Sequence, residues 1–174
     1  MDSAKTHIML LFLPMFFANV MHMVIVKKNW FSPLAIPISV QHFGSSKTWR
    51  GFVVLGILSA IVSYFSNHYF GPFYFLDSQA LWVGAGLGIT YMCFELPNSF
   101  IKRRLGIKNG AQSMRFKYFQ AFVDKSDSLI GILLYYKIVT QIPFSSVAIL
   151  YLVSLSIHIT VSYTLVMIKV KKSF

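Results

Sequence analysis

Acidic residues are scarce in this chain. Only 5 of its 174 residues are Asp or Glu, against 16 Lys and Arg, and charged residues of all kinds make up 12% of the sequence. A soluble domain carries roughly a quarter of its residues as charged side chains. Hydrophobic residues make up 56%, and the mean hydropathy is +0.62. A water-soluble fold of this length cannot bury that much apolar surface, so the composition excludes an ordinary soluble domain.

Cysteine is nearly absent as well. The single residue, Cys93, lies inside an apolar run and excludes an intrachain disulfide framework. The net charge of +11 is compatible with binding to nucleic acid, to anionic lipid headgroups or to a phosphate-bearing substrate. The basic residues lie between apolar runs and do not follow one soluble face, which favours lipid and phosphate and argues against nucleic acid.

Long apolar runs occupy most of the chain. A helix that crosses a bilayer needs about 20 mainly apolar residues. The sequence therefore predicts an all-α fold, a polytopic integral membrane helical bundle with about five transmembrane helices, formed by a single domain over residues 1–174. The expected helices cover residues 8–26, 52–69, 81–100, 119–136 and 147–168. The first is interpreted as a mature helix and not as a signal peptide, because it lacks a small-residue cleavage site.

The distribution of Lys and Arg predicts the topology in the cell membrane. Basic residues concentrate in the loops after the first and third helices and in the C-terminal tail. The other side has only Lys5 and Lys137. We therefore expect the N-terminus outside, the C-terminus inside, and any active surface on the cytoplasmic side. Residues 31–40 of the first loop, which contain Pro33 and Pro37, are expected to be re-entrant or interfacial.

Three of the five acidic residues, Glu95, Asp124 and Asp127, lie in or beside the third and fourth expected helices. A charged side chain at membrane depth costs roughly 2.5–3.5 kcal/mol on insertion scales, so its presence there indicates a functional site. Asp124 and Asp127 are three residues apart and share one helix face. Mg²⁺ with phosphate oxygens is the usual cation between such carboxylates, and Glu95 is a third candidate ligand. Neutralisation by Lys125, Lys102 or Arg103 explains the pattern equally well.

Two basic segments are candidates for phosphate binding. Residues 99–108, SFIKRRLGIK, hold four cations directly after a helix. Arginine binds phosphate bidentately, although positive-inside anchoring is the simpler alternative. Residues 44–51, GSSKTWRG, combine two cations with hydroxyls and glycines that permit close backbone approach to phosphate. In the first helix, Asn19 and His22 form a polar stripe that suits either a headgroup or hydrogen bonds to a neighbouring helix.

The order of these segments resembles the CDP-archaeol synthase family, which is related to the CDP-diacylglycerol synthases (phosphatidate cytidylyltransferases). The matching elements are KTWRG at 47–51, SFIKRRLGIK at 99–108, the pair Asp124-x-x-Asp127, and Ala18-Asn19 in the first helix. They extend over nearly the whole chain. The two strings are quite specific together, whereas each alone is weak.

The resemblance implies an enzyme, a nucleotidyltransferase. It would convert CTP and a membrane lipid phosphate, similar to archaetidate or phosphatidate, to a CDP-lipid with release of pyrophosphate. The implied cofactor is Mg²⁺, and the implied partners are CTP, the lipid phosphate and membrane lipids, with a homodimer left open and nucleic acid excluded. The implied metal ligands are Asp124, Asp127 and Glu95, and the implied catalytic residues are Asp124, Asp127, Lys102 and Arg103. The implied substrate-binding residues are Asn19, Lys47, Thr48, Arg50, Ser99, Arg104 and Lys108.

The chain departs from the family pattern at two places. Phe94-Glu95 stands where the family commonly has Gly-Asp, and Lys125-Ser126 stand between the paired aspartates, where Gln-Leu or Arg-Leu is usual. A longer acid shifts a metal ligand, and a lysine beside the aspartates competes with a metal. The alternative function is therefore a non-catalytic membrane scaffold or lipid-binding protein on the same fold. No motif distinguishes ether-linked isoprenoid tails from fatty acyl tails, because apolar grooves accept both.

Overall fold

Helices account for every regular element in the part of the chain that the computed structural model describes, residues 4–71, 77–109, 111 and 117–168. The five long helices are α2 (Leu13–Lys27), α4 (Trp49–Phe70), α5 (Asp77–Arg104), α6 (Lys117–Thr140) and α7 (Phe144–Met167). The short elements are α1 (Ala4–His7), the π-helical η1 (Ile8–Phe12), the 3-10 turn η2 (Ser32–Leu34) and α3 (Val40–Phe43). The predicted all-α fold is confirmed.

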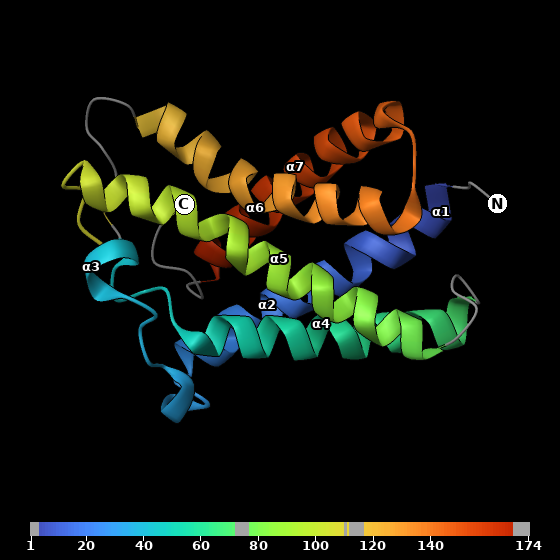
Figure 1. The fold of residues 1–174 in the computed structure, drawn as a ribbon, viewed down its shortest axis with the longest axis horizontal. Coiled ribbons are helices and arrows are strands. Elements are labelled where there is room, and N and C mark those ends of the chain that lie inside the picture. Colours follow the sequence, from blue (N-terminus) through green and yellow to red (C-terminus); the bar gives the residue numbers. More distant parts are fainter. Residues whose placement is uncertain (1–3, 72–76, 110, 112–116, 169–174) are drawn as a thin grey trace.

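The long helices run along the long axis of the molecule (Figure 1). α1 begins at one end of the bundle, and α7 finishes at the other, where α3 and η2 also lie. The chain starts and finishes at opposite ends because the five long helices of the described chain make an odd number of passes along the bundle. The basic C-terminal tail, residues 169–174, lies outside the described residues.

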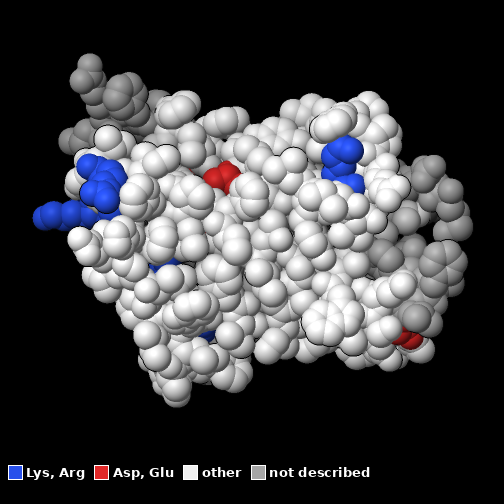
Figure 2. Space-filling view, in the orientation of Figure 1, with Lys and Arg blue, Asp and Glu red and all other residues white. Residues whose placement is uncertain are grey.

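Four segments are long and apolar enough to cross a membrane by length and composition. They are Leu10–Lys27, Trp49–Phe70, Asp77–Arg104 and Phe144–Met167. Within the described residues α6 does not qualify, although its length is sufficient, since Asp124, Lys125 and Asp127 make its first half polar. On the face drawn in Figure 2, charged side chains lie mainly toward the two ends of the long axis, and the middle is largely uncharged apart from a small acidic patch. The predicted polytopic membrane bundle is confirmed, and the expected number of about five spans agrees with four qualifying helices among the described residues and α6 as the fifth long helix.

Small residues bring α4 and α5 into close contact, the most extensive helix pairing in the bundle. A Cβ atom added at Gly84 would lie 2.4 Å from the Ser59 carbonyl oxygen, and one added at Gly88 would lie 2.4 Å from the Leu55 carbonyl oxygen. Gly84 and Gly88 are four residues apart and so occupy the same helix face. Helices in lipid associate through such small-residue faces, which let the backbones approach.

One short turn ends α5 at its C-terminus, and another precedes the N-terminus of α7. α5 continues through Pro97 and ends at Arg104, where Gly106 has φ +70° and the Ile107 amide donates to the Lys102 carbonyl at 3.0 Å. This pattern is a glycine C-cap of the Schellman type, which stops the helix directly after its three basic residues. Pro143 is the N-cap of α7, and Gln141 before it has φ +53°.

The loop between α2 and α4 is exposed and folds back on itself. Trp30 and Phe31 are exposed, and η2 and α3 are too short to cross a bilayer. The Ile38 amide donates to the Lys47 carbonyl at 2.9 Å, and the Trp49 amide donates to the Ile36 carbonyl at 3.1 Å. These two bonds hold the segment before α4 in an extended conformation, which places Lys47 beside α5.

Candidate functional site

A cavity of about 560 Å³ lies where the loop before α4 meets the long helices. Its walls come from α2, α4, α5, α6 and α7 as well as from residues 45–48 of the loop. The polar residues that line it are Asn19, His22, Ser45, Ser46, Lys47, Thr48, Arg50, Tyr91, Glu95, Asp124, His158 and Ser162. Predicted site residues among them are Asn19, Lys47, Thr48, Arg50, Glu95 and Asp124. Side chains from distant parts of the sequence thus share one cavity.

Lys47 forms an ion pair with Glu95 across the cavity wall. Both side chains are about one-fifth exposed, so the pair is largely shielded from water. Burial alone would lower the pKa of Lys47. The charge of Glu95 and its hydrogen bond outweigh that effect, and the pKa of Lys47 is raised above its ordinary value of 10.5. Lys47 is therefore fully charged at physiological pH.

Asp124 and Asp127 are joined through one amide group. Nδ2 of Asn98 donates to Oδ1 of Asp124 and to Oδ2 of Asp127, each at 2.8 Å. The Ser128 backbone amide also donates to Oδ1 of Asp127 at 2.6 Å, and Lys102 forms an ion pair with Asp124. The expected one-face geometry of the two aspartates is present, because a single nitrogen contacts both. The Asn98 amide and the Lys102 ammonium offset the repulsion between the two aspartate charges.

The arrangement of acidic groups bears on metal binding. Within the described residues, no group of three or more His, Cys, Asp and Glu side chains is close enough to hold a metal ion. Glu95 pairs with Lys47, whereas Asp124 and Asp127 lie together around Asn98. Magnesium binding by these three acids therefore stays a prediction. The protein itself offers two neighbouring carboxylates.

Arg50 is held by the loop that precedes it. It is only 7% exposed, and its Nη1 donates to Oδ1 of Asn29 and to the Trp30 carbonyl oxygen, both at 3.1 Å. Its Nε is also buried and has no hydrogen-bond partner among the described residues. Arg50 thus fixes the exposed Trp30 segment through its Nη1, while its side chain also lines the cavity.

Contacts between the two predicted cytoplasmic loops close the site at its basic end. Nδ2 of Asn109 donates to Oγ of Ser45 at 2.7 Å, and the His42 ring stacks on Phe100 with centroids 6.0 Å apart. Gly44 has φ +85°, and a Cβ there would lie 2.1 Å from the Asn109 side chain. Only glycine fits this crossing, so the GSSK segment is held against the residues that follow α5.

The remaining predicted site residues lie outside the described lining of the cavity. Ser99 is buried, and its hydroxyl donates to the Glu95 carbonyl oxygen at 2.9 Å. Arg103 is half-buried, with its Nε buried and unpartnered in the described structure. Arg104 is exposed and lies over the Phe100 ring at 5.0 Å, and Lys108 is exposed. Their predicted substrate contacts therefore stay predictions.

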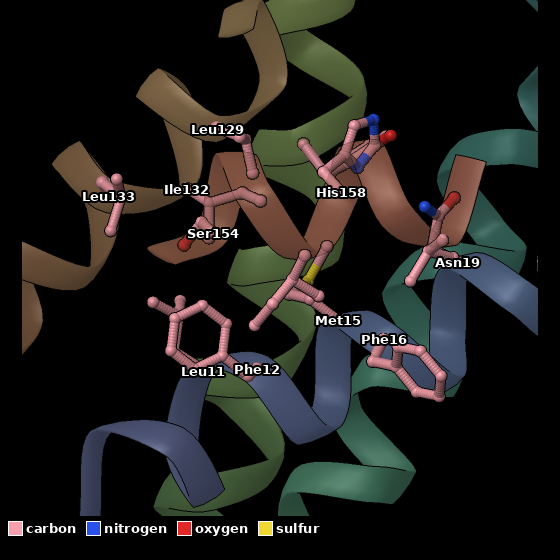
Figure 3. A pocket seen from close by; sticks show the side chains of 13 residues that line it. Leu11, Phe12, Met15, Phe16, Asn19, Leu129, Ile132, Leu133, Ser154 and His158 are labelled. Atoms are coloured by element: carbon pink, nitrogen blue, oxygen red, sulfur yellow. The ribbon is translucent and has the colours of Figure 1, made fainter. Parts of the chain in front are cut away.

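An apolar pocket adjoins the polar cavity (Figure 3). Its apolar lining residues from η1, α2, α6 and α7 include Phe12, Met15, Leu129, Ile132, Leu133, Ile157 and Val161. Three residues, Asn19, Tyr91 and His158, line both the pocket and the polar cavity. The two spaces therefore meet at these side chains.

Sequence reasoning missed several residues of the site. Asn98 lies next to Pro97 in an apolar helix, and its neighbours in sequence carry no signal for a carboxylate partner. His158 belongs to no motif in the sequence, although a polar residue in an apolar helix is itself a signal. Tyr91 and Ser162 are buried cavity residues with no distinguishing motif.

Comparison with known proteins gives one match. The family model described as CarS-like, CDP-archaeol synthase, matches residues 5–174. Neither the curated proteins nor the solved structures include a significant match to the chain. The family match covers the described elements from the second residue of α1 to the end of α7, and it agrees with the resemblance found in the sequence motifs.

Proposed function

Since the chain belongs to the CarS-like CDP-archaeol synthase family, we propose that it is a CTP-dependent cytidylyltransferase that acts on a membrane lipid phosphate. The products are a CDP-lipid and pyrophosphate, and the lipid resembles archaetidate or phosphatidate. The proposed active side is cytoplasmic, with the N-terminus outside and the C-terminus inside.

The observation that carries this proposal is the pairing of a cation-bearing cavity with an apolar pocket. The cavity is lined by Lys47 and Arg50, whose cationic side chains are donors for phosphate oxygens. The pocket next to it is lined mainly by apolar side chains. A substrate with both a phosphate and a hydrocarbon chain matches the two spaces together, whereas a soluble nucleotide alone matches only one.

The reaction is a substitution at phosphorus. A phosphate oxygen of the lipid attacks the α-phosphorus of CTP, and the bond from that phosphorus to the oxygen bridging to the β-phosphate breaks as pyrophosphate leaves. Transfer of this kind depends on positioning and on neutralisation of charge more than on covalent help from the protein. Lys47, Thr48 and Arg50 bind phosphate oxygens on the loop side. Lys102 and Arg103 neutralise charge on the α5 side.

Asp124 and Asp127 fit a magnesium site that is completed by substrate. Magnesium usually takes only one or two protein carboxylates and fills its shell with water and substrate phosphates. Oxygens of both aspartates lie 2.8 Å from the same Asn98 nitrogen and so present adjacent ligands. When bound, the ion would neutralise the negative charge of the reacting phosphates. Glu95, which is paired with Lys47, would be the candidate for a third ligand.

The ion pairs favour one alternative, a non-catalytic scaffold or lipid-binding protein on the same fold. Glu95 and Asp124 each already have a lysine partner, which neutralises them without a metal. A scaffold of this kind would bind the lipid phosphate but would not consume CTP.

The proposal is tested with the purified full chain, radiolabelled CTP, Mg²⁺ and a panel of lipid phosphates with isoprenoid ether or fatty acyl ester tails. We expect pyrophosphate release and a labelled lipid with at least one tail class. Asp124→Asn and Asp127→Asn should abolish the activity. Asp77→Asn is the matched control, because Asp77 lies at the other end of α5, bound to Asn67 and His68, and should keep it.

A wild-type chain that binds lipid phosphate but releases no pyrophosphate with any member of the panel would favour the scaffold. Equal activity in the wild type and in Asp124→Asn would contradict the proposed role of the acidic pair.

A further inference from the structure

A histidine on α7 lies where the polar cavity and the apolar pocket meet. His158 lines both spaces, as do Asn19 on α2 and Tyr91 on α5. Figure 3 places His158 and Asn19 toward one end of the pocket, while Leu11 and Leu133 lie toward the other. Three of the four described polar residues that line the pocket, Asn19, Tyr91 and His158, therefore lie at its junction with the cavity, whereas Ser154 lies among the apolar residues.

From the cavity through the junction to the pocket, the lining groups change from cationic to polar to apolar, as the groups of an amphiphile do. Lys47 and Arg50 lie in the polar cavity, the imidazole, amide and phenol groups form the junction, and leucine, isoleucine and methionine side chains follow in the pocket. A lipid phosphate has the same order of groups: a phosphate, ester or ether oxygens, then hydrocarbon. Imidazole and amide N–H groups are donors for the oxygens at that level.

We infer that His158 is a lipid-binding residue that donates a hydrogen bond to a headgroup oxygen of the lipid phosphate at this junction. Asn19 supports it from α2, and the first carbons of one chain enter the apolar pocket. The inference rests on the proposed function for the identity of the lipid and adds the residue that distinguishes a lipid-linked phosphate from a soluble one.

The size of the pocket limits how much of a chain it holds. The space in it that water-sized groups can enter has a volume of about 60 Å³. One water needs roughly 10–15 Å³ on that measure, so the pocket accepts a few carbons and the rest of the chain lies in the bilayer. Recognition is thus concentrated near the headgroup, where His158 lies.

His22 provides a contrast within the same cavity. It is one turn beyond Asn19 on α2 and lines the polar cavity but is not among the described residues of the apolar pocket. Its Nε2 lies 3.7 Å from the position that a Cβ on Gly51 would occupy, so it faces the start of α4. The junction role therefore belongs to His158 and not to every histidine of the cavity.

The kinetic test compares three variants of the full chain in detergent with lipid phosphate and CTP varied separately. His158→Leu should raise the KM for lipid phosphate about tenfold while the KM for CTP stays within about twofold, as for the loss of one hydrogen bond to the lipid. His158→Gln keeps an N–H donor and should recover part of the loss. His68→Leu, an exposed histidine beside Asp77, is the matched control and should leave both KM values unchanged.

A second measurement does not depend on turnover. A lipid phosphate with a diazirine on the first carbons of its chain should cross-link to peptides of α2 and α7 that contain Asn19 and His158. Excess long-chain lipid phosphate should block the cross-link, and glycerol 3-phosphate should not. His158→Leu should reduce its yield even if that variant is inactive, and a thermal melt shows that it is folded.

Equal rises in both KM values, or cross-links found only on the outer surfaces of the bundle, would overturn the inference. If the wild type releases no pyrophosphate but the cross-link forms as described, the proposed function fails and the lipid site remains.

Discussion

The acidic side chains in and beside the cavity are neutralised or hydrogen-bonded by partners that lie far away in the sequence. Lys47 reaches Glu95 from a loop 48 residues away, and Asn98 reaches Asp124 and Asp127 from the neighbouring helix. Removal of one member of a buried ion pair is costly because the other charge is left without a partner. The partners of the acids are therefore as important to the site as the acids themselves.

Lys47→Met should destabilise the folded protein by about 3–5 kcal/mol, because Glu95 is left buried and unpaired. In a chain of this size the melting temperature should fall by roughly 10 °C. The double variant Lys47→Met with Glu95→Gln should recover most of the loss, since the remaining side chain is neutral. Thermal melts of the detergent-purified proteins measure both. A double variant as unstable as the single one would show that the ion pair is not the cause.

The raised pKa of Lys47 gives the same pair a pH dependence. A lysine whose pKa is higher in the folded state contributes stability that is complete below its ordinary value of 10.5 and is lost as the pH rises through the folded-state value. Melting temperatures measured between pH 8 and pH 12, a range of about 4 units chosen to bracket that value, should fall at the alkaline end. The fall should be smaller in the double variant, which lacks both ionisable groups.

Asn98→Ala should remove both amide hydrogen bonds to the aspartates and leave two like charges adjacent. Hydrogen bonds to charged groups contribute about 1.5–3 kcal/mol, so the melting temperature in EDTA should fall. Mg²⁺ should restore more stability to this variant than to the wild type, because a cation between the carboxylates replaces the lost donors. An equal response to Mg²⁺ in both proteins would argue against an ion at Asp124 and Asp127.

Among single residues, the sequence predicted the acids and named Lys102 as a possible partner, but it did not predict Lys47 or Asn98 as partners. Glu95, Asp124 and Asp127 were recognisable because charge is rare in apolar helices. The pairing of Glu95 with Lys47 depends on how the loop before α4 folds back through the bonds at Ile38 and Trp49, which no local pattern encodes.

Among the helices, the contact between α4 and α5 is the most specific. Gly88→Ala places a methyl group against the Leu55 backbone, which cannot move without separating the helices. Such overpacking costs about 1–3 kcal/mol. Gly56→Ala is the matched control, because its nearest neighbour, an Ile89 side-chain carbon, is at an ordinary 3.5 Å. Melting temperatures should fall for Gly88→Ala and stay near the wild-type value for Gly56→Ala.

Helix positions followed from hydropathy, whereas their ends did not. The expected ranges 52–69 and 119–136 fall inside α4 and α6, each of which extends a few residues further. α5 passes through Pro97 and ends only at the Gly106 turn, because a proline removes one backbone donor but does not stop a long helix that is packed on both sides. α6 is less apolar than a typical span since its acidic pair faces the site.

For the whole molecule, the orientation in the membrane remains the main prediction from the charge distribution. Cys93 is the only cysteine, so Cys93→Ser provides a background without thiols. In that background Ser78→Cys should react with a membrane-impermeant maleimide in intact cells. Lys108→Cys should react only after the cells are opened. Both positions are exposed, so accessibility within the protein does not limit labelling. The reverse pattern would place the site on the outer side.

The ion pairs in the site also affect which of the basic residues can attract anionic groups from outside. The chain carries a net charge of +11, yet Glu95 and Asp124 neutralise Lys47 and Lys102 inside the site. Exposed lysines such as Lys27 and Lys28 remain available to an anionic bilayer. Attraction between exposed charges weakens as ionic strength rises, whereas shielded pairs are much less affected. Added salt should therefore weaken the attraction between these exposed lysines and acidic headgroups well before it weakens the ion pairs inside the site.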